Sequence, residues 1–309
     1  YEFYRCDWSS DVCSSDLHIL APTDFSGPSR HAAERAARLA REHGARLHLL
    51  HVVHAGALER LRALLGADTG VEPELILDAN RQLEALAAEL GGAHGPGIEI
   101  SLRNGSVLTE VDAQADAIGA ELVVLGARGA GFVRRIALGT TAERLLRTTR
   151  RPLLVVKQKA HEPYRRVLVP VDFSASSVAT ITLARRVAPG ASVVLLHAYE
   201  VPFETRMRMA GVDTQRIEQY RAQAKQSAHQ RLHEAAAAAG LRPGQWRPCL
   251  LMQDPSLAIV EQEQEADCDL IVIGKHGAGM VEDFLLGSVT KHVLAESAGD
   301  VLVSTARTA

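Results

Sequence analysis

Aromatic residues are scarce in this chain of 309 residues, where Phe, Trp and Tyr together make up only 4%. So few rings argue against the stacking platforms that bind single-stranded nucleic acid. The formal net charge is only -3, which removes the electrostatic case for nucleic acid or an anionic membrane as a partner. The longest purely apolar runs, such as residues 122–125, are far shorter than the roughly 20 residues of a membrane helix. We therefore expect neither nucleic acid nor a membrane as a partner.

Cysteine is also sparse, and two of the four cysteines lie in the first 17 residues, which read YEFYRCDWSSDVCSSDL. This stretch has no hydrophobic periodicity and resembles the translation of a common DNA-sequencing adapter. We therefore expect residues 1–17 to be a non-native segment and exclude them from the fold. The other two, Cys249 and Cys268, have no metal-type spacing and make no disulfide framework. A reduced, cytoplasmic protein is expected.

The rest of the chain consists of two similar sequence units in tandem. The stretch ILAPTDFS from residue 19 matches VLVPVDFS from residue 167, and LVVLG from residue 122 matches LIVIG from residue 270. The Gly-Thr pair at 139 matches the Gly-Ser pair at 287, so all three matches share an offset of 148 residues. A period far above 50 residues indicates duplicated domains rather than a solenoid. We expect a first domain at 18–157, a linker at 158–163 and a second domain at 164–305.

Short runs rich in β-branched residues alternate with helical patterns in both units. Leu83, Leu86, Ala87 and Leu90, for example, share one face of a helix. Such alternation predicts an α/β fold in which an open, parallel, Rossmann-like sheet carries helices on both faces. The expected strands lie near 18–22, 46–53, 97–103, 121–126 and 152–157, and near 166–171, 192–199, 246–252, 269–274 and 300–304.

Two short motifs follow predicted strands in each unit. An Asp follows the first strand, and the fourth strand leads into the pattern Gly-x2-Gly-x9-Gly-[Ser/Thr]. Glycines allow backbone amides to approach an anion, and a helix that starts after the last Gly offers free N–H groups to phosphate. The ends of parallel strands are also where open sheets bind ligands. The candidate residues are Asp24, Gly126, Gly129, Gly139 and Thr140 in the first unit, and Asp172, Gly274, Gly277, Gly287 and Ser288 in the second.

Each of these residues also has a purely structural interpretation. A lone Gly-x2-Gly is usually a turn, and an Asp or a Gly-Ser before a helix is usually a cap. His51 and His197, at equivalent strand ends, are interpreted as structural because no Ser or Cys nucleophile pattern accompanies them. The chain lacks both the P-loop and the dinucleotide fingerprint. Repetition in the same order in both units favours a binding site over a set of unrelated turns and caps.

With these motifs, the region from 18 to 305 resembles a tandem universal stress protein of the ATP-binding branch. The resemblance implies an adenine-nucleotide α-hydrolase-like fold and ATP as the ligand, with or without Mg²⁺. It also implies that Leu47 and Val193, on the second strands, help the two Asp residues to hold the nucleoside. Thr290 would add a hydroxyl at the phosphate end, where the first unit has Ala142. The last strands, 153–156 and 301–303, would pair within the chain, with further homodimerisation possible.

The resulting prediction is a nucleotide-dependent stress-response binding module that is not an efficient enzyme, although slow ATP hydrolysis is compatible with it. Two alternatives remain open. One is a scaffold of the same family that no longer binds nucleotide, and the other is an adenylyl-transfer or ATP-hydrolysing enzyme of the wider superfamily.

Loop charges differ between the two units. The first loop carries Arg128, Arg134 and Arg135, whereas the second carries Lys275 against Glu282 and Asp283. Because ATP is strongly anionic, metal-free nucleotide is expected to bind the first unit better, with Mg²⁺ narrowing the gap.

Deleting residues 1–17 should leave thermal stability nearly unchanged, because nothing in this segment matches the repeated unit. Differential scanning calorimetry of the truncated and full-length chains measures this. A loss above about 2 kcal/mol, the size of a core defect, would show that the segment is packed in the fold.

Overall fold

The computed structural model describes residues 17–65, 71–91, 97–127, 129, 138–199, 204–277 and 286–305. Strands and helices alternate through both halves, as predicted. The first half contains β1 (His18–Pro22), α1 (Gly27–His43), β2 (Arg46–His54), α2 (Ala55–Leu65), α3 (Val71–Gly91), β3 (Ile98–Gly105), α4 (Val107–Ala117), β4 (Leu122–Gly126), α5 (Thr140–Thr148) and β5 (Leu153–Val156). The second half contains β6 (Arg166–Pro170), α6 (Ser176–Val187), β7 (Ser192–Ala198), α7 (Glu204–Met209), α8 (Thr214–Ala238), β8 (Trp246–Leu251), α9 (Pro255–Glu265), β9 (Leu270–Gly274), α10 (Ser288–Glu296) and β10 (Asp300–Ser304).

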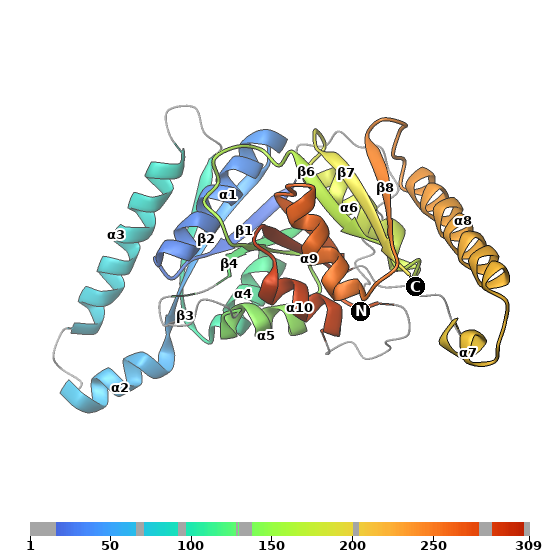
Figure 1. Cartoon of the computed structure of the whole chain (residues 1–309). Helices are drawn as coiled ribbons and strands as arrows, with labels where there is room; N and C mark the ends of the chain where they lie inside the picture. Colours follow the sequence, from blue (N-terminus) through green and yellow to red (C-terminus); the bar gives the residue numbers. More distant parts are fainter. Residues whose placement is uncertain are drawn as a thin grey trace, which may run out of the picture.

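The ten strands of the described residues form one continuous sheet in the order β3-β2-β1-β4-β5-β10-β9-β6-β7-β8 (Figure 1). Within each half all neighbouring strands are parallel. The halves meet where β5 and β10 pair antiparallel, with Leu154 opposite Leu302. The predicted strands and the α/β class are therefore confirmed, and each domain contributes five strands to a shared sheet.

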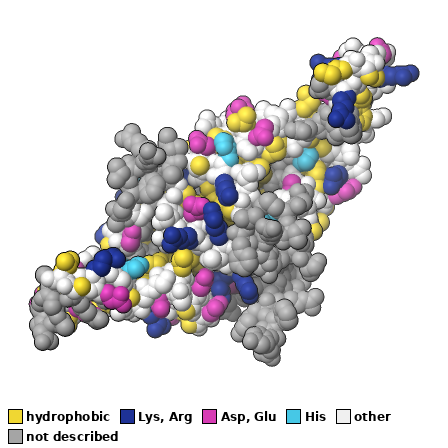
Figure 2. Space-filling model, turned by 90° about the horizontal axis from the view of Figure 1, so that it is seen from below, with side chains coloured by type: hydrophobic (Ala, Val, Ile, Leu, Met, Phe, Trp, Pro, Cys, Tyr) yellow, Lys and Arg dark blue, Asp and Glu magenta, His cyan; other side chains and the backbone are white. Residues whose placement is uncertain are grey.

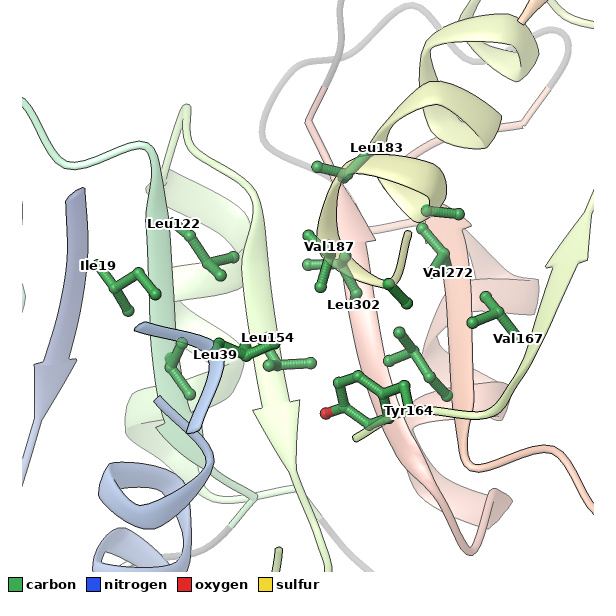
Figure 3. Packing of buried hydrophobic residues seen from close by; sticks show 14 of the residues in the cluster. Ile19, Leu39, Leu122, Leu154, Tyr164, Val167, Leu183, Val187, Val272 and Leu302 are labelled. Atoms are coloured by element: carbon green, nitrogen blue, oxygen red, sulfur yellow. The ribbon is translucent and has the colours of Figure 1, made fainter. Parts of the chain in front are cut away.

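Helices cover both faces of this sheet, so most strand residues are buried. Helices α1, α3, α6 and α8 pack on one face, and α4, α5, α9 and α10 pack on the other. Successive strand residues point to opposite faces, so Ile19 belongs to one cluster and Leu20 to the other. Figure 3 shows that the first cluster runs across the junction, since Leu154 and Leu302 lie in it together. The two domains thus share their hydrophobic cores.

Local sequence signals explain where the first helices begin and end. Helix α1 starts after Ser26, whose side chain accepts a hydrogen bond from the Ser29 N–H, and Pro28 occupies its first turn. It ends at Gly44, which has a φ of 61°, a conformation that costs Gly little. Helix α3 buries Leu83, Leu86 and Leu90, the stripe that its periodicity predicts.

A buried carboxylate ties the two domains together at the end of the shared sheet. Asp300, on β10, is 1% exposed and accepts hydrogen bonds from the Tyr164 hydroxyl at 2.6 Å and the Lys157 N–H at 2.8 Å. The Arg35 guanidinium of α1 lies 3.3 Å from the same carboxylate and 4.1 Å from the centre of the Tyr164 ring. Burial raises the pKa of Asp300, while these partners favour its charged form.

The outer surface carries charges of both signs. Figure 2 shows Lys and Arg interspersed with Asp and Glu over the face seen there. Exposed ion pairs such as Arg30–Glu89, 2.6 Å apart, contribute little to stability because water screens them. Within the described residues, no helix combines the length and the apolar character needed to cross a membrane.

The structure corrects the expected edge of the N-terminal segment by one residue. Residues 1–16 lie outside the described residues, but Leu17 is only 8% exposed and joins the core of the first domain. Its carbonyl accepts a hydrogen bond from the Arg46 N–H at 3.0 Å. Leu17 therefore belongs to the fold, and the deletion proposed above should end at residue 16.

Replacing Asp300 by Ala should destabilise the protein by about 3–5 kcal/mol, because it leaves Arg35 as a buried charge without its acidic partner. Urea unfolding of the variant measures the loss. Replacing Glu89 by Ala is the matched control, because it breaks an exposed ion pair and should cost less than about 1 kcal/mol. Equal losses in the two variants would show that Asp300 does not join the domains as described.

Candidate functional site

The candidate site in each domain lies where the strand order reverses. Strand β1 stands between β2 and β4, and β6 stands between β7 and β9. Within each domain these strands are parallel, so their carboxyl ends share one edge and leave a crevice there. Asp24 follows β1 and Gly126 ends β4, while Asp172 follows β6 and Gly274 ends β9. The fold thus brings together motifs that lie about a hundred residues apart in the sequence.

The two Asp residues fix the turns in which they lie. Asp172 Oδ1 accepts hydrogen bonds from the Ser174 N–H at 3.0 Å, the Ser174 hydroxyl at 2.6 Å and the Ser177 hydroxyl at 3.0 Å. Asp24 Oδ1 binds the N–H and hydroxyl of Ser26 in the same way. One carboxylate oxygen of each Asp therefore holds a turn rather than capping a helix, because Ser26 caps α1 and the N-cap of α6 is Ala175. The other oxygen, Oδ2, lies toward the glycine loop, close to Gly129 in the first domain and Gly277 in the second.

A strained residue follows each Asp. Phe25 and Phe173 have φ values of 61° and 58°, in the left-handed region that non-glycine residues rarely adopt. Each ring packs on a histidine, Phe25 on His51 at 4.3 Å and Phe173 on His197 at 4.2 Å between ring centres. This ring packing helps to offset the backbone strain and holds the Asp at the crevice.

The two histidines are held by the backbone. His197 Nδ1 lies 2.7 Å from the Val171 carbonyl, and His51 Nδ1 lies 2.8 Å from the Thr23 carbonyl. Burial lowers the pKa of His197, so its neutral form is favoured. A carbonyl can only accept, so Nδ1 of each ring carries a proton, and in the neutral ring of His197 Nε2 is an acceptor. These contacts support the structural role expected for both histidines.

A cavity of about 480 Å³ opens at the crevice of the second domain. This volume lies within the range of small-molecule sites. All residues that the sequence predicts for the binding site of this domain line the cavity, except Val193. Those that line it are Asp172, Gly274, Gly277, Gly287, Ser288 and Thr290.

The predicted helix starts lie at the crevices of both domains. Gly287 caps α10, and its N–H bonds to the Lys275 carbonyl at 3.1 Å. Gly139 caps α5 in the same way, with its N–H bonded to the Ala127 carbonyl at 2.8 Å. Thr140 is the first residue of α5. The amide groups of each first turn lack partners within the helix, so each helix presents donors suited to an anion.

Leu47 and Val193 do not lie at these sites, which corrects the prediction for both. Leu47 pairs with Ile19 near the start of β1, whereas Leu50 pairs with Pro22 at its end. Three residues along a strand place Leu47 about 10 Å from the crevice. Val193 likewise pairs with Val167, at the start of β6. Both side chains are buried in the core instead.

The second-strand residues that do line the cavity lie three to five positions later than Val193. They are Leu196, His197 and Ala198. Sequence reasoning also missed three hydroxyl residues of α6 and the start of α9. These lining residues are Ser176, Ser177, Thr180, Pro255 and Ile259. The run of hydroxyls directly after Asp172 is a signal in the sequence that could have indicated the first three.

Lys275 does not act as a loop charge in the second domain. It is 8% exposed, and its ammonium group donates a hydrogen bond to the Arg147 carbonyl of α5 at 2.7 Å. That carbonyl lies at the negative end of a helix of the other domain, a position that favours a cation. The predicted difference in loop charge between the two units also depends on five other charged residues. These lie outside the described residues: Arg128, Arg134, Arg135, Glu282 and Asp283.

In the first domain, the first turn of α1 lies close against Gly126. A Cβ atom added at Gly126 would lie 2.7 Å from the backbone of Pro28. The closest atom to an added Cβ at Gly274 would be the His276 carbonyl oxygen at 3.1 Å. Position 142 also differs, since Ala142 is buried where Thr290 donates a hydrogen bond to the Gly274 carbonyl at 2.9 Å. The two crevices therefore have equivalent glycines at their strand ends, but the contacts of these glycines and the residue at position 142 or 290 differ.

A duplicated, open parallel α/β sheet with a crevice at each switch point defines a class of Rossmann-like domains. Comparison with known proteins identifies the family within this class. The model of the universal stress protein family matches residues 17–157 and 163–305. The chain therefore belongs to the universal stress protein family and carries two of its domains in tandem.

Individual relatives agree with this assignment. A universal stress protein of Mycolicibacterium smegmatis is 28% identical, and the match covers 94% of this chain and 97% of the relative. A universal stress protein of Mycobacterium tuberculosis (strain ATCC 25618 / H37Rv) is 28% identical over 74% of this chain and 77% of its own length. The crystal structure of a universal stress protein from Archaeoglobus fulgidus DSM 4304 has the same fold, with a TM-score of 0.67 at 21% identity, covering 93% of this chain and 97% of that one.

Within the part of the chain that the structure describes, no three His, Cys, Asp or Glu side chains gather into a possible metal site. Cys268 is buried, and burial raises the pKa of its thiol to about 11. The thiol form of this residue is therefore the stable one at neutral pH, as expected for a packing residue.

Replacing Gly126 by Ala should destabilise the protein by about 1–3 kcal/mol, because the new methyl group would press on the Pro28 backbone. Replacing Gly274 by Ala is the matched comparison and should cost less, because its closest contact is longer. Chemical unfolding of both variants measures the difference. A larger loss for the Gly274 variant would contradict the packing described for the two crevices.

Proposed function

We propose that this protein is an ATP-binding universal stress protein, which acts as a nucleotide-dependent binding module in the stress response. The observation that carries the proposal is the cavity of about 480 Å³ in the second domain. The cavity is lined by the acidic Asp172, by glycines that allow a ligand to approach the backbone, and by the N-terminus of α10. Together these features suit a nucleoside joined to phosphate.

Different parts of the cavity lining suit different parts of a nucleotide. Asp172 is held by the hydroxyls of Ser174 and Ser177, and its carboxylate can accept hydrogen bonds from a ribose. Ser288 and Thr290 lie in the first turn of α10, whose amides can donate hydrogen bonds to phosphate oxygens. Apolar lining residues, such as Ile259 and Ile273, can pack against a base.

The proposed role is binding rather than turnover. The pKa of His197 is lowered by burial, and its Nδ1 is occupied by the Val171 carbonyl. Asp172 Oδ1 is occupied by three donors of its own turn. These residues are engaged in holding the shape of the cavity, which favours a site that recognises its ligand over one that transforms it.

Replacing Gly287 by Val should remove nucleotide binding at the second domain, because the closest neighbour of an added Cβ is the Lys275 carbonyl oxygen at only 3.4 Å. The branched side chain would fill the space before α10. Replacing Gly139 by Val should do the same at the first domain. Isothermal titration with MgATP measures the stoichiometry, and the double variant should bind no nucleotide.

Controls separate this proposal from its rivals. Thermal melting of each variant checks that it folds, and Ser288→Ala offers a milder change at the same helix start. Wild-type protein that binds no nucleotide would favour a scaffold. Hydrolysis of ATP faster than roughly 1 per second, the lower range of typical enzymes, would favour an enzyme.

A further inference from the structure

Among the described residues, few donors lie where α10 begins in the second-domain cavity, the part proposed to hold phosphate. The Gly287 N–H is already bonded to the Lys275 carbonyl, which leaves the amides of the first turn of α10, at residues 288–290. Thr290 lines the cavity, but its hydroxyl proton is donated to the Gly274 carbonyl at 2.9 Å. Thr180 likewise donates to the Ser176 carbonyl at 3.0 Å. The Ser174 hydroxyl donates to Asp172, so the Ser176 hydroxyl, 3.0 Å away, donates to Ser174. Among the described lining residues on this side, Ser288 is the remaining hydroxyl donor.

This set matches the needs of one phosphate group. A helix start and one hydroxyl can donate to the oxygens of a single phosphate. A triphosphate has more oxygens than these donors can satisfy. It also carries roughly twice the negative charge of a single phosphate.

No basic side chain compensates for that charge among the described residues that line the cavity. Their ionisable members are Asp172, His197 and His276. Lys275 lies between the lining residues Gly274 and His276 in the sequence, but it does not line the cavity and instead binds the Arg147 carbonyl of the first domain. The sequence that joins Gly277 to Leu286 contains Glu282 and Asp283 and neither Lys nor Arg.

We infer that the second-domain cavity recognises adenosine that carries a single phosphate, and that it accepts ATP only when a divalent cation neutralises the outer phosphates. This inference rests on the proposed function, from which it takes the adenine nucleotide. It makes the two domains unequal, since the sequence places Arg128 in the first domain where His276 stands in the second.

The experiment isolates the second site by blocking the first with Gly139→Val. Thr140→Glu provides a second way to block it, because Thr140 is an exposed residue in the first turn of α5 and a new carboxylate there would repel phosphate. In EDTA, AMP should bind either variant at least about tenfold more tightly than ATP, and adenosine should bind more weakly than AMP. Excess Mg²⁺ should bring the affinity of ATP to within a few-fold of that of AMP. Isothermal titration calorimetry measures each dissociation constant.

Two further variants test the cause. His276→Arg introduces the residue that the first domain has at this position, and it should raise the affinity of metal-free ATP more than that of AMP. Lys275→Met is the matched control, because it removes the cation that directly precedes His276 in the sequence. The ammonium group of Lys275 binds the Arg147 carbonyl, so the ratio of AMP to ATP affinity should not change.

Metal-free ATP that binds as tightly as AMP would overturn the inference, and so would adenosine that binds as tightly as AMP. A selective loss of ATP binding in Lys275→Met would also overturn it, because Lys275 would then serve the ligand. Absence of binding by all three compounds, with and without Mg²⁺, would instead overturn the proposed function. The outcomes for the two proposals are thus distinct.

Discussion

The antiparallel pairing of β5 with β10 is the constraint on which the rest of the structure depends. It joins two five-stranded sheets into one and allows both hydrophobic cores to continue from domain to domain. Asp300 stabilises this junction, because its buried carboxylate receives the Tyr164 hydroxyl and the Lys157 N–H and lies beside the Arg35 guanidinium of the other domain. A buried charge held by partners from both domains fixes how they meet, since any other arrangement would leave it unpaired.

The same junction has a consequence for the crevices. The chain reverses direction between the two sheets, so the carboxyl ends of the two sets of strands point in opposite directions, and each domain keeps its own crevice. Contact between the domains is still close, because Lys275, directly after Gly274 in the second crevice, donates to the Arg147 carbonyl of α5 in the first domain. Helix α5 therefore begins at the crevice of the first domain, and its last turn contacts Lys275 beside the crevice of the second domain.

Duplication has preserved the framework of the site more strictly than its ligand-facing chemistry. Both copies keep the Asp, a Phe with left-handed backbone whose ring packs on a His, and a glycine before the helix start. They differ at Ala142 and Thr290, and at Pro28 and Ser176. The framework residues are held by backbone geometry, which tolerates little change, whereas hydroxyls and charges that face a crevice can change without harm to the fold. The unequal ligand preferences proposed above for the two domains rest on this difference.

The sequence alone determined the fold class, the duplication and the strands, because burial on both faces of a parallel sheet requires continuous apolar runs such as those at 122–125 and 270–273. It also indicated the glycines and acids of the crevices, because their order repeats. It could not place Leu47 and Val193, since the level of a residue in the sheet depends on strand register, which side chains far apart in sequence decide together. Nor could it show that Lys275 faces another domain: the direction of a long side chain is settled by the partner that packing brings within reach, here the Arg147 carbonyl at the end of α5.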